Sequence, residues 1–318
     1  MKKISIVTII IGVVLVIASF VIVEFSGTNM LDSIRDFSEE KQSNLTYEEQ
    51  TFTTDNLAEI NVKTHNDLVK VVSSPDIDQV KVEYYTTDNI KFEINKHDSE
   101  LSIKKRETNP RWWFLNFNFD ERQIVIHVPA DSVFDYDLVT SNGSIELTGI
   151  SVDELDIETS NALVRLDNIK ARDEISIETS NAKIDLNNVK SPSDIDIKTS
   201  NGLISLTGVD ASAIWTKTSN ALVAFTETTA NTIWAKTSNG RIELDRLASG
   251  DITLDTSNAT VQGSIVGVAG DFRKDISTSN GEILINESEY GKKVKDDQGA
   301  KKLVISTSNA RVDISFKD

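Results

Sequence analysis

Three pairs of carboxylates are spaced so that both members of a pair face the same side of an extended strand. They are Asp156 with Glu158, Asp194 with Asp196, and Asp251 with Asp255. Acid pairs on the outer face of an elongated β-repeat protein could supply general acid–base catalysis for cleaving a long sugar chain. The chain has 50 acidic residues, and at that density such pairs arise by chance. We therefore interpret them as solvated surface residues.

No other residues have the spacing of a catalytic or metal-binding motif. His65, His97 and His127 each lack a second histidine at ligand spacing. Cysteine is absent, which excludes disulfides, thiolate metal sites and a cysteine nucleophile. Calcium-repeat, P-loop, dinucleotide-binding and nucleophile-elbow sequences are missing too. The sequence therefore predicts a protein that is not an enzyme and has no catalytic residues, metal or cofactor.

The tryptophans are the candidate binding residues of this sequence. Trp112 and Trp113 lie beside Arg111 in the densest aromatic stretch and could stack on a sugar or contact a partner protein. We favour a second interpretation, in which these rings cover unpaired strand edges at one end of a stack. Trp215 and Trp234 are 19 residues apart and are expected to face outward together. The four tryptophans form the candidate interaction surface.

The charge balance excludes one class of partner. The chain carries 50 Asp and Glu against 33 Lys and Arg, a formal net charge of −17. A surface of this sign repels phosphate backbones, and no basic stripe offsets it. We therefore expect no nucleic-acid binding.

Most of the candidate residues lie among repeats of a tag, Thr-Ser-Asn followed by Gly or Ala. The tag predicts the strands that carry them. It occurs nine times, mostly at steps of 19 or 20 residues, which is typical of stacked structural units. Apolar and polar residues alternate on both sides of the tag, so each unit should contain two short strands and a corner. The tag threonines are Thr140, Thr159, Thr179, Thr199, Thr218, Thr237, Thr256, Thr278 and Thr307.

The residue after the tag asparagine distinguishes two architectures. An Asn-Gly hairpin needs positive φ at both central residues, yet five of the nine copies carry Ala. A corner in which only Asn is left-handed accepts either residue. We therefore predict an all-β fold, a single-stranded parallel β-solenoid with coils about 4.8 Å apart.

Matching tag residues should superpose in such a stack and form a structural ladder. Stacked asparagines can hydrogen-bond through their side-chain amides, so Asn201→Leu should cost about 1 to 3 kcal/mol. The ladder residues are Thr159, Asn161, Thr179, Asn181, Thr199, Asn201, Thr218, Asn220, Thr237, Asn239, Thr256 and Asn258.

The regular repeats occupy residues 139–318. Residues 56–138 lack the tag but keep alternating apolar pairs about 20 residues apart, beginning at Ile60, Val80, Leu101 and Ile124. We interpret this region as degenerate coils and an N-terminal cap, and a separate small β-domain is the alternative. Residues 25–55 form a polar spacer, and the charged stretch 286–302 reads as an exposed loop.

Residues 4–23 are uncharged and almost all aliphatic, long enough to cross a membrane as a helix. A cleaved signal peptide is the alternative, but no small-x-small cleavage site follows. We predict an anchor at residues 1–24. Lys2 and Lys3 precede the span, which places the N-terminus in the cytoplasm and the rest of this single-pass protein outside the cell membrane.

The anchor, the Trp-rich lead-in before Ile124 to Pro129 and the tagged coils resemble a bacterial family of putative adhesins with a domain of unknown function, which includes LiaG-like membrane proteins. The resemblance covers roughly residues 55–318. It implies a cell-envelope β-repeat protein of a low-GC Gram-positive-type bacterium, with a role in adhesion or envelope stress, and brings no catalytic residues.

The sequence therefore predicts a non-catalytic, membrane-anchored extracytoplasmic protein, either an adhesin or an accessory protein of the envelope stress response. Its expected partners are the membrane, through residues 4–23, and a cell-wall polymer or an envelope protein. The alternative is a β-helix protein that binds or cleaves polysaccharide. Release of sugar fragments would reveal cleavage.

Overall fold

Alternating apolar and polar residues on each side of the tag form short strands that place their apolar side chains on one face. The structure is a computed structural model that describes residues 46–87, 90–107 and 123–317. The chain divides into two units. The first comprises Met1–Thr46 and Thr86–Asp88, and only Thr46, Thr86 and Thr87 of it are described. The second, Tyr47–Tyr85 and Asn89–Asp318, contains the repeats and is the unit described below.

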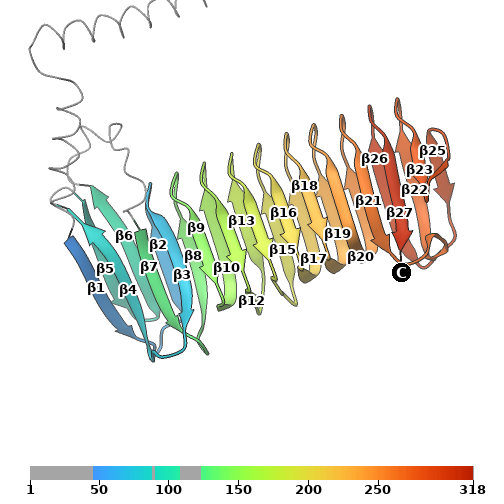
Figure 1. The fold of residues 1–318 in the computed structure, drawn as a ribbon. Coiled ribbons are helices and arrows are strands. Elements are labelled where there is room, and N and C mark those ends of the chain that lie inside the picture. The colour runs from blue at the N-terminus through green and yellow to red at the C-terminus, as the bar shows by residue number, and fades with distance from the viewer. Residues whose placement is uncertain (1–45, 88–89, 108–122, 318) are drawn as a thin grey trace, which may run out of the picture. The chain divides into compact units, whose positions relative to one another are not determined.

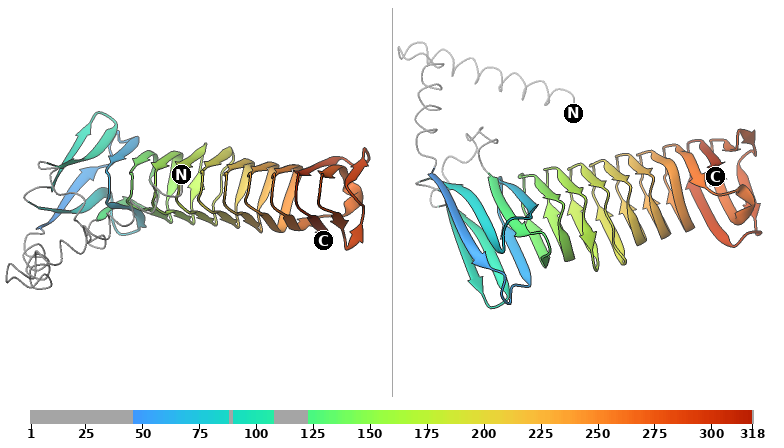
Figure 2. Two further views of the ribbon diagram at one scale, coloured as in Figure 1. Left: turned by 90° about the horizontal axis from the view of Figure 1, so that it is seen from above. Right: turned by 60° about the horizontal axis from the view of Figure 1, so that its bottom comes forward.

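Each regular coil contributes one strand to each of two sheets, A and B, and successive coils build a rod (Figures 1 and 2). Sheet B contains β8 (Val133–Val139), β10 (Ser151–Thr159), β13 (Ile175–Thr179), β15 (Asp194–Lys198), β17 (Asp210–Lys217) and β19 (Thr229–Lys236). Sheet A contains β9 (Ile145–Thr148), β11 (Val164–Asp167), β14 (Ile184–Asn187), β16 (Ile204–Thr207) and β18 (Val223–Thr226). β20 (Ile242–Asp255) passes from sheet A into sheet B, and β12 (Lys170–Ala171) lies beside β10. The predicted all-β solenoid is therefore confirmed.

Strands of neighbouring coils are parallel and in register, so like residues stack. In sheet B, Ile157 pairs with Ile177 and Ile177 with Ile197; in sheet A, Val164 pairs with Ile184. All five side chains are at most 1% exposed. Burying a side chain of this size stabilises the fold by about 1.5 to 3 kcal/mol, so the core between the two sheets holds the rod together.

The tag corner differs from the prediction, because no tag asparagine has a positive φ. The left-handed residues lie at the opposite corner, after the sheet A strands, at Gly149, Asn168, Asn188, Gly208, Glu227 and Arg246. Gly and Asn adopt this conformation readily, whereas Glu227 and Arg246 do so at a steric cost. The side chains of Glu227 and Arg246 form an ion pair across adjacent coils.

The N-terminal end, predicted as degenerate coils and a cap, contains parallel coils together with antiparallel strands. β2 (Glu59–Lys63) and β3 (Leu68–Ser74) form one parallel coil next to β8 and β9, and β6 (Glu100–Glu107) and β7 (Gln123–Pro129) follow outward. β4 (Gln79–Thr86) and β5 (Ile90–His97) instead pair antiparallel with β7 and β6, and β1 (Thr46–Thr53) lies beside β4. The two-residue connection between β5 and β6, with φ of 51° at Asp98, allows only a hairpin.

The last tagged coil is inserted between its two predecessors. β26 (Lys301–Thr307) pairs with β20 and β22 (Phe272–Thr278), and β27 (Val312–Lys317) pairs with β21 (Val261–Val266) and β23 (Ile283–Ile285). The tag order along the rod is therefore Thr256, Thr307, Thr278. A short helix, η2 (Ala269–Asp271), precedes β22.

The charged stretch 286–302 is partly a cap. β24 (Ser288–Glu289) pairs antiparallel with β23, and β25 (Lys293–Asp296) with β22. These strands occupy the outer edge of the rod, so the next coil can pair only on the inner side of β22 and β23. The stretch is mostly exposed, as predicted, but Ser288–Glu289 and Lys293–Asp296 form strands within the predicted loop.

Within the described residues, no helix is long and apolar enough to cross a membrane. The predicted span, residues 4–23, and the cluster containing Trp112 and Trp113 both lie outside the described residues.

Candidate functional site

Most tag threonines fasten their corner to a neighbouring coil, whereas the buried hydroxyl of Thr159 has no hydrogen-bond partner. Oγ1 of Thr199 accepts a hydrogen bond from the backbone N–H of Gly202 at 3.1 Å and donates to the carbonyl of Ser180 at 3.4 Å. Thr179 and Thr237 make the same pair of bonds in their coils. The tag threonines are buried, so these hydroxyls satisfy backbone groups that water does not reach. Their role is structural.

The tag asparagines form one continuous ladder. Each Nδ2 donates to Oδ1 of the asparagine in the neighbouring coil at 2.6–2.8 Å. All members except Asn66 are exposed. In spatial order the ladder contains Asn66, Asn142, Asn161, Asn181, Asn201, Asn220, Asn239, Asn258, Asn309 and Asn280.

One rung of this ladder was missed in the sequence. Thr64-His65-Asn66-Asp67 occupies a tag corner, although it shares only Thr and Asn with the other copies. The alternation of Val62, Thr64 and Val69 around it would have found this corner. The carboxylate of Asp67 pairs with Nζ of Lys105 at 3.0 Å, and both side chains are at most 3% exposed.

Thr199→Val should destabilise the protein more than Asn201→Leu. The first change leaves the buried N–H of Gly202 without its partner and should cost about 1 to 3 kcal/mol. The second breaks two exposed amide bonds that water can replace, so the expected cost falls to about 1 kcal/mol. Urea unfolding midpoints measure the difference. A larger loss for Asn201→Leu would show that the ladder, rather than the threonine corner, secures the coil.

The candidate acid pairs lie on the outward face of sheet B. Asp156 and Glu158 stack in register beside Asp137 and Glu178 of neighbouring coils, on a flat face. Asp196, Asp251 and Asp255 each pair with a lysine, respectively Lys198 at 2.6 Å, Lys302 at 3.1 Å and Lys236 at 2.7 Å.

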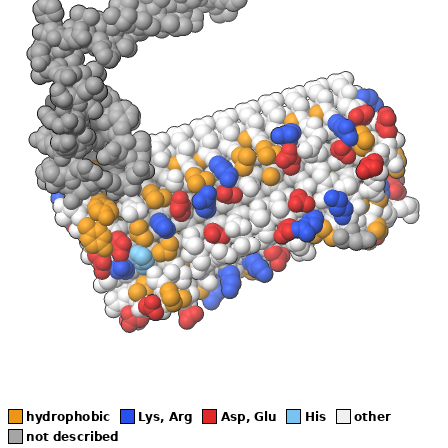
Figure 3. Space-filling model, in the orientation of Figure 1, with side chains coloured by type: hydrophobic (Ala, Val, Ile, Leu, Met, Phe, Trp, Pro, Cys, Tyr) orange, Lys and Arg blue, Asp and Glu red, His pale blue; other side chains and the backbone are white. Residues whose placement is uncertain are grey.

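Burial disfavours the charge on Asp255, but hydrogen bonds from Lys236 and Ser306 outweigh it and lower its pKa. A carboxyl group with a lowered pKa is ionised at neutral pH. It then has no proton to donate and cannot serve as a general acid. On the face shown in Figure 3, acidic and basic side chains are interspersed. The geometry therefore favours structural ion pairs over catalysis.

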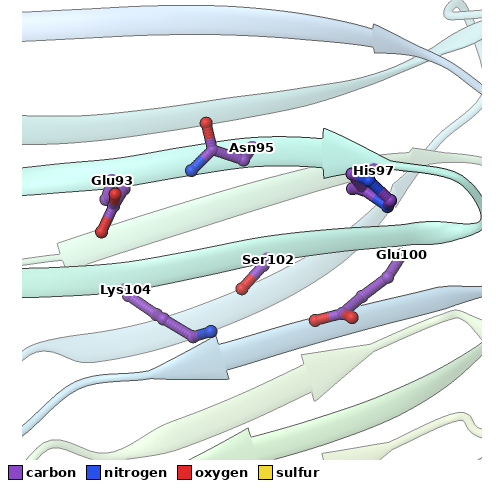
Figure 4. A pocket seen from close by; sticks show the side chains of 6 residues that line it. All are labelled: Glu93, Asn95, His97, Glu100, Ser102 and Lys104. Atoms are coloured by element: carbon purple, nitrogen blue, oxygen red, sulfur yellow. The ribbon is translucent and has the colours of Figure 1, made fainter.

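A shallow depression of about 290 Å³ lies on the β5–β6 hairpin (Figure 4). Glu93 lies opposite Lys104 across the strands, and His97 lies opposite Glu100. Such cross-strand pairs stabilise a hairpin. In the parts of the chain that are described, no group of three or more metal-ligating side chains could hold a metal ion.

Carboxylates crowd together at this end of sheet B. Glu59 lies in register between Glu100 and Asp135. Partial burial raises its pKa, and repulsion from Glu100, Asp137 and Asp135 raises it further.

Glu59→Gln should therefore stabilise the protein at about pH 7. The folded state binds the proton of Glu59 more tightly than the unfolded chain, so the ionised carboxylate opposes folding above its pKa. Below about pH 4 the residue is protonated in both states and the gain should vanish. Thermal unfolding at both pH values measures this. As a control, Glu282→Gln removes a carboxylate paired with Arg311 and should bring no gain. A gain for Glu59→Gln that persists at low pH would contradict the electrostatic cause.

Three residues distant in sequence meet on sheet A. Oγ of Ser74 lies 3.1 Å from Nδ1 of His127, and Nε2 of His127 lies 3.5 Å from Oε1 of Glu83. A serine, a histidine and a carboxylate can activate a nucleophile. However, the bond from Lys81 lowers the pKa of Glu83 and occupies its carboxylate, and β3 is paired on both sides. The contacts hold His127 on the face of the sheet between Ser74 and Glu83.

Trp215 and Trp234 lie side by side on the outward face of sheet B. They pair in register across β17 and β19, with ring centroids 6.1 Å apart and planes inclined by 42°. Trp215 is 39% exposed. We refer to these two residues as the tryptophan platform. It is the part of the candidate interaction surface that lies within the described residues.

The comparisons with known proteins agree with the fold. A family model described as Toastrack DUF4097 matches residues 57–318. A putative adhesin from Parabacteroides distasonis is 12% identical, with a TM-score of 0.50 over 86% of this chain and 97% of that chain. One from Parabacteroides merdae is 10% identical, with a TM-score of 0.46 over the same shares. At such identities a likeness concerns the fold alone. Among curated proteins, none matches.

Proposed function

The chain belongs to the Toastrack DUF4097 family, and from that premise we propose that it is a non-catalytic adhesin of the cell envelope. The observation that carries the proposal is the unbroken stack of coils, joined from Asn66 to Asn280 by one ladder. A stack in which every coil is fastened to the next is a stiff spacer. Three of its candidate acids, Asp196, Asp251 and Asp255, are engaged by lysines, which suits binding better than catalysis. The name of the Parabacteroides distasonis protein, a putative adhesin, supports the same role.

The proposal includes an anchor at residues 4–23, with the repeats outside the membrane. The twenty uncharged residues of this segment support it. In intact cells producing the full chain, protease added outside should degrade the repeats, and alkaline carbonate should leave the chain in the membrane fraction. Protection of the repeats from protease, or their release by carbonate, would contradict this part of the proposal.

Co-sedimentation with cell envelopes tests the binding function. The full chain in detergent micelles should pellet with isolated envelopes at micromolar concentration and release no reducing sugars. A chain that stays in the supernatant would overturn the adhesin. A catalytic release of reducing ends would establish the alternative, a polysaccharide-cleaving protein, in its place.

An accessory role in the envelope stress response is the second form of this proposal, and it rests on the family resemblance of the tagged coils. Deleting the gene should then change the induction of an envelope-stress reporter by a cell-wall antibiotic. A deletion that lowers adhesion and leaves the reporter unchanged would restrict the function to adhesion.

A further inference from the structure

The outward face of sheet B changes in character at β17 and β19. One column of this face consists of residues in register from coil to coil. In the coils before and after the tryptophan platform this column carries short polar or acidic side chains. In order, its members are Asp137, Asp156, Ser176, Asp196, Trp215, Trp234 and Thr253. The column continues to Val304, and the two indoles are the only aromatic groups among these residues.

The core does not require these indoles. Their strands already bury Ile214 and Ile233 on the inward face, both 0% exposed. Trp215 remains 39% exposed, and is one of four exposed large hydrophobic side chains among the residues that the structure describes. An exposed aromatic surface of this kind is favourable when a ligand covers it.

A column of lysines runs directly beside the platform, a local exception to the acidic surface expected from the net charge of −17. Lys198, Lys217 and Lys236 stand in register in three successive coils, two residues after Asp196, Trp215 and Trp234, respectively. Nζ of Lys198 lies 2.6 Å from Asp196, and Nζ of Lys236 lies 2.7 Å from Asp255.

No ion pair joins the central member, Lys217, to any carboxylate of the described residues. Lys217 is exposed, so its ammonium group can pair with an anion at the surface of the sheet.

We propose that Trp215, Trp234 and Lys217 form a binding site for an acidic glycan, a sugar chain that carries carboxylate or phosphate groups. The C–H face of a sugar ring packs on the indoles, and the acidic substituent of that sugar pairs with Lys217. The hydroxyl of Thr232, two residues before Trp234 on the same face, lies on the other side of the platform to meet sugar hydroxyls. This inference rests on the proposed function, because it names what the adhesin binds.

The surroundings of the platform favour a glycan over a protein. A stable protein interface buries about 800 Å² on each partner around an apolar centre. On this face the two rings are bordered by Ala213, Thr232, Thr253 and ion-paired Asp and Lys side chains. A narrow strip of two rings with polar margins fits a single sugar chain.

Titration of the full chain with defined oligosaccharides tests the site. The probes are an oligogalacturonate, which carries carboxylates, a glycerol phosphate oligomer substituted with sugars, and a cello-oligosaccharide of equal length as the neutral comparison. At least one acidic probe should bind about tenfold more tightly than the neutral probe, and the excess should shrink as salt is added. The two acidic probes distinguish carboxylate from phosphate recognition. Failure of both to bind, or equal affinity for the neutral probe, would overturn the inference.

Variants of the platform locate the binding. Trp215→Ala and Trp234→Ala should each weaken binding of the acidic probe about tenfold or more, whereas Trp215→Phe should retain most of it. Lys217→Gln should remove the preference for the acidic probe and leave binding of the neutral probe unchanged. Tyr290→Ala, at another exposed aromatic residue, is the matched control and should change nothing. Unchanged binding in Trp215→Ala, or an equal loss in Tyr290→Ala, would contradict the site.

The envelope assay separates this inference from the proposed function. If Trp215→Ala and Trp234→Ala still pellet with envelopes as the parent chain does, the adhesin stands and the platform is not its site. If the parent chain itself does not pellet, the proposed function fails.

Discussion

Gly263→Ala is expected to lower the free energy of unfolding by about 3 kcal/mol or more. Gly263 has a φ of +131°, a conformation that residues with a side chain rarely adopt. A Cβ atom at this position would lie 1.9 Å from the carbonyl oxygen of Leu244 in the adjacent coil. Urea unfolding at constant pH measures the loss.

Gly270→Ala is the matched control. No atom lies within 4 Å of a Cβ atom built at Gly270, and its φ is not positive. The change should stay within about 0.5 kcal/mol. Equal, small effects at both glycines would show that β21 does not approach β20 as closely as described. Gly263 pairs with Leu244 at the point where the register shifts between Leu244 and Leu247, so the close approach of the two strands requires glycine there.

Ile305→Asp is expected to cost more than about 4 kcal/mol, and Val304→Asp less than about 1 kcal/mol. Ile305 is 0% exposed and stacks between Leu254 and Ile276, so a carboxylate there would be buried without a partner. Val304 is the adjacent residue of the same strand and faces outward. Thermal unfolding and near-ultraviolet circular dichroism measure the difference. Equal losses would show that β26 does not enter the core between β20 and β22.

The repeat unit could be predicted because its physical causes are local. The alternation around Thr159 determines which side chains enter the core, and alanine after the tag asparagine excludes a hairpin. The prediction of a left-handed tag asparagine was wrong, because the sequence pattern also permits a corner without a left-handed residue. The left-handed position lies at the opposite corner, where Gly149 and Gly208 mark it in the sequence.

The two ends of the rod could not be predicted from the period. Tagged coils are interchangeable as stacking partners, so nothing in the tags of Thr278 and Thr307 decides which of them lies next to Thr256. The cap made by β24 and β25 decides it: β24 folds back on β23 through the two-residue turn at Asn286 and Glu287, and β25 pairs antiparallel with β22. At the other end, the turn at Asp98 was a local signal for a hairpin that the repeat period obscured.

Candidate-site residues could be placed from the sequence only where their spacing follows the repeat. The spacing of Trp215 and Trp234 equals one coil, which was enough to place them on one face. Ser74, Glu83 and His127 come from three strands whose pairing is not periodic, so their meeting could not be read from spacing. The ion pair of Asp67 with Lys105 was hidden for the same reason.

Engineered disulfides test the order of the coils most directly. The chain has no cysteine, so a double variant can form only one intramolecular disulfide. Neighbouring coils are about 4.8 Å apart, within the reach of a disulfide, whereas coils two steps apart are separated by roughly 10 Å. On mild oxidation, Asn258→Cys with Asn309→Cys should therefore crosslink and Asn258→Cys with Asn280→Cys should not, as Asn309 bonds to both Asn258 and Asn280. Crosslinking of 258 with 280 and not with 309 would contradict the stack described above.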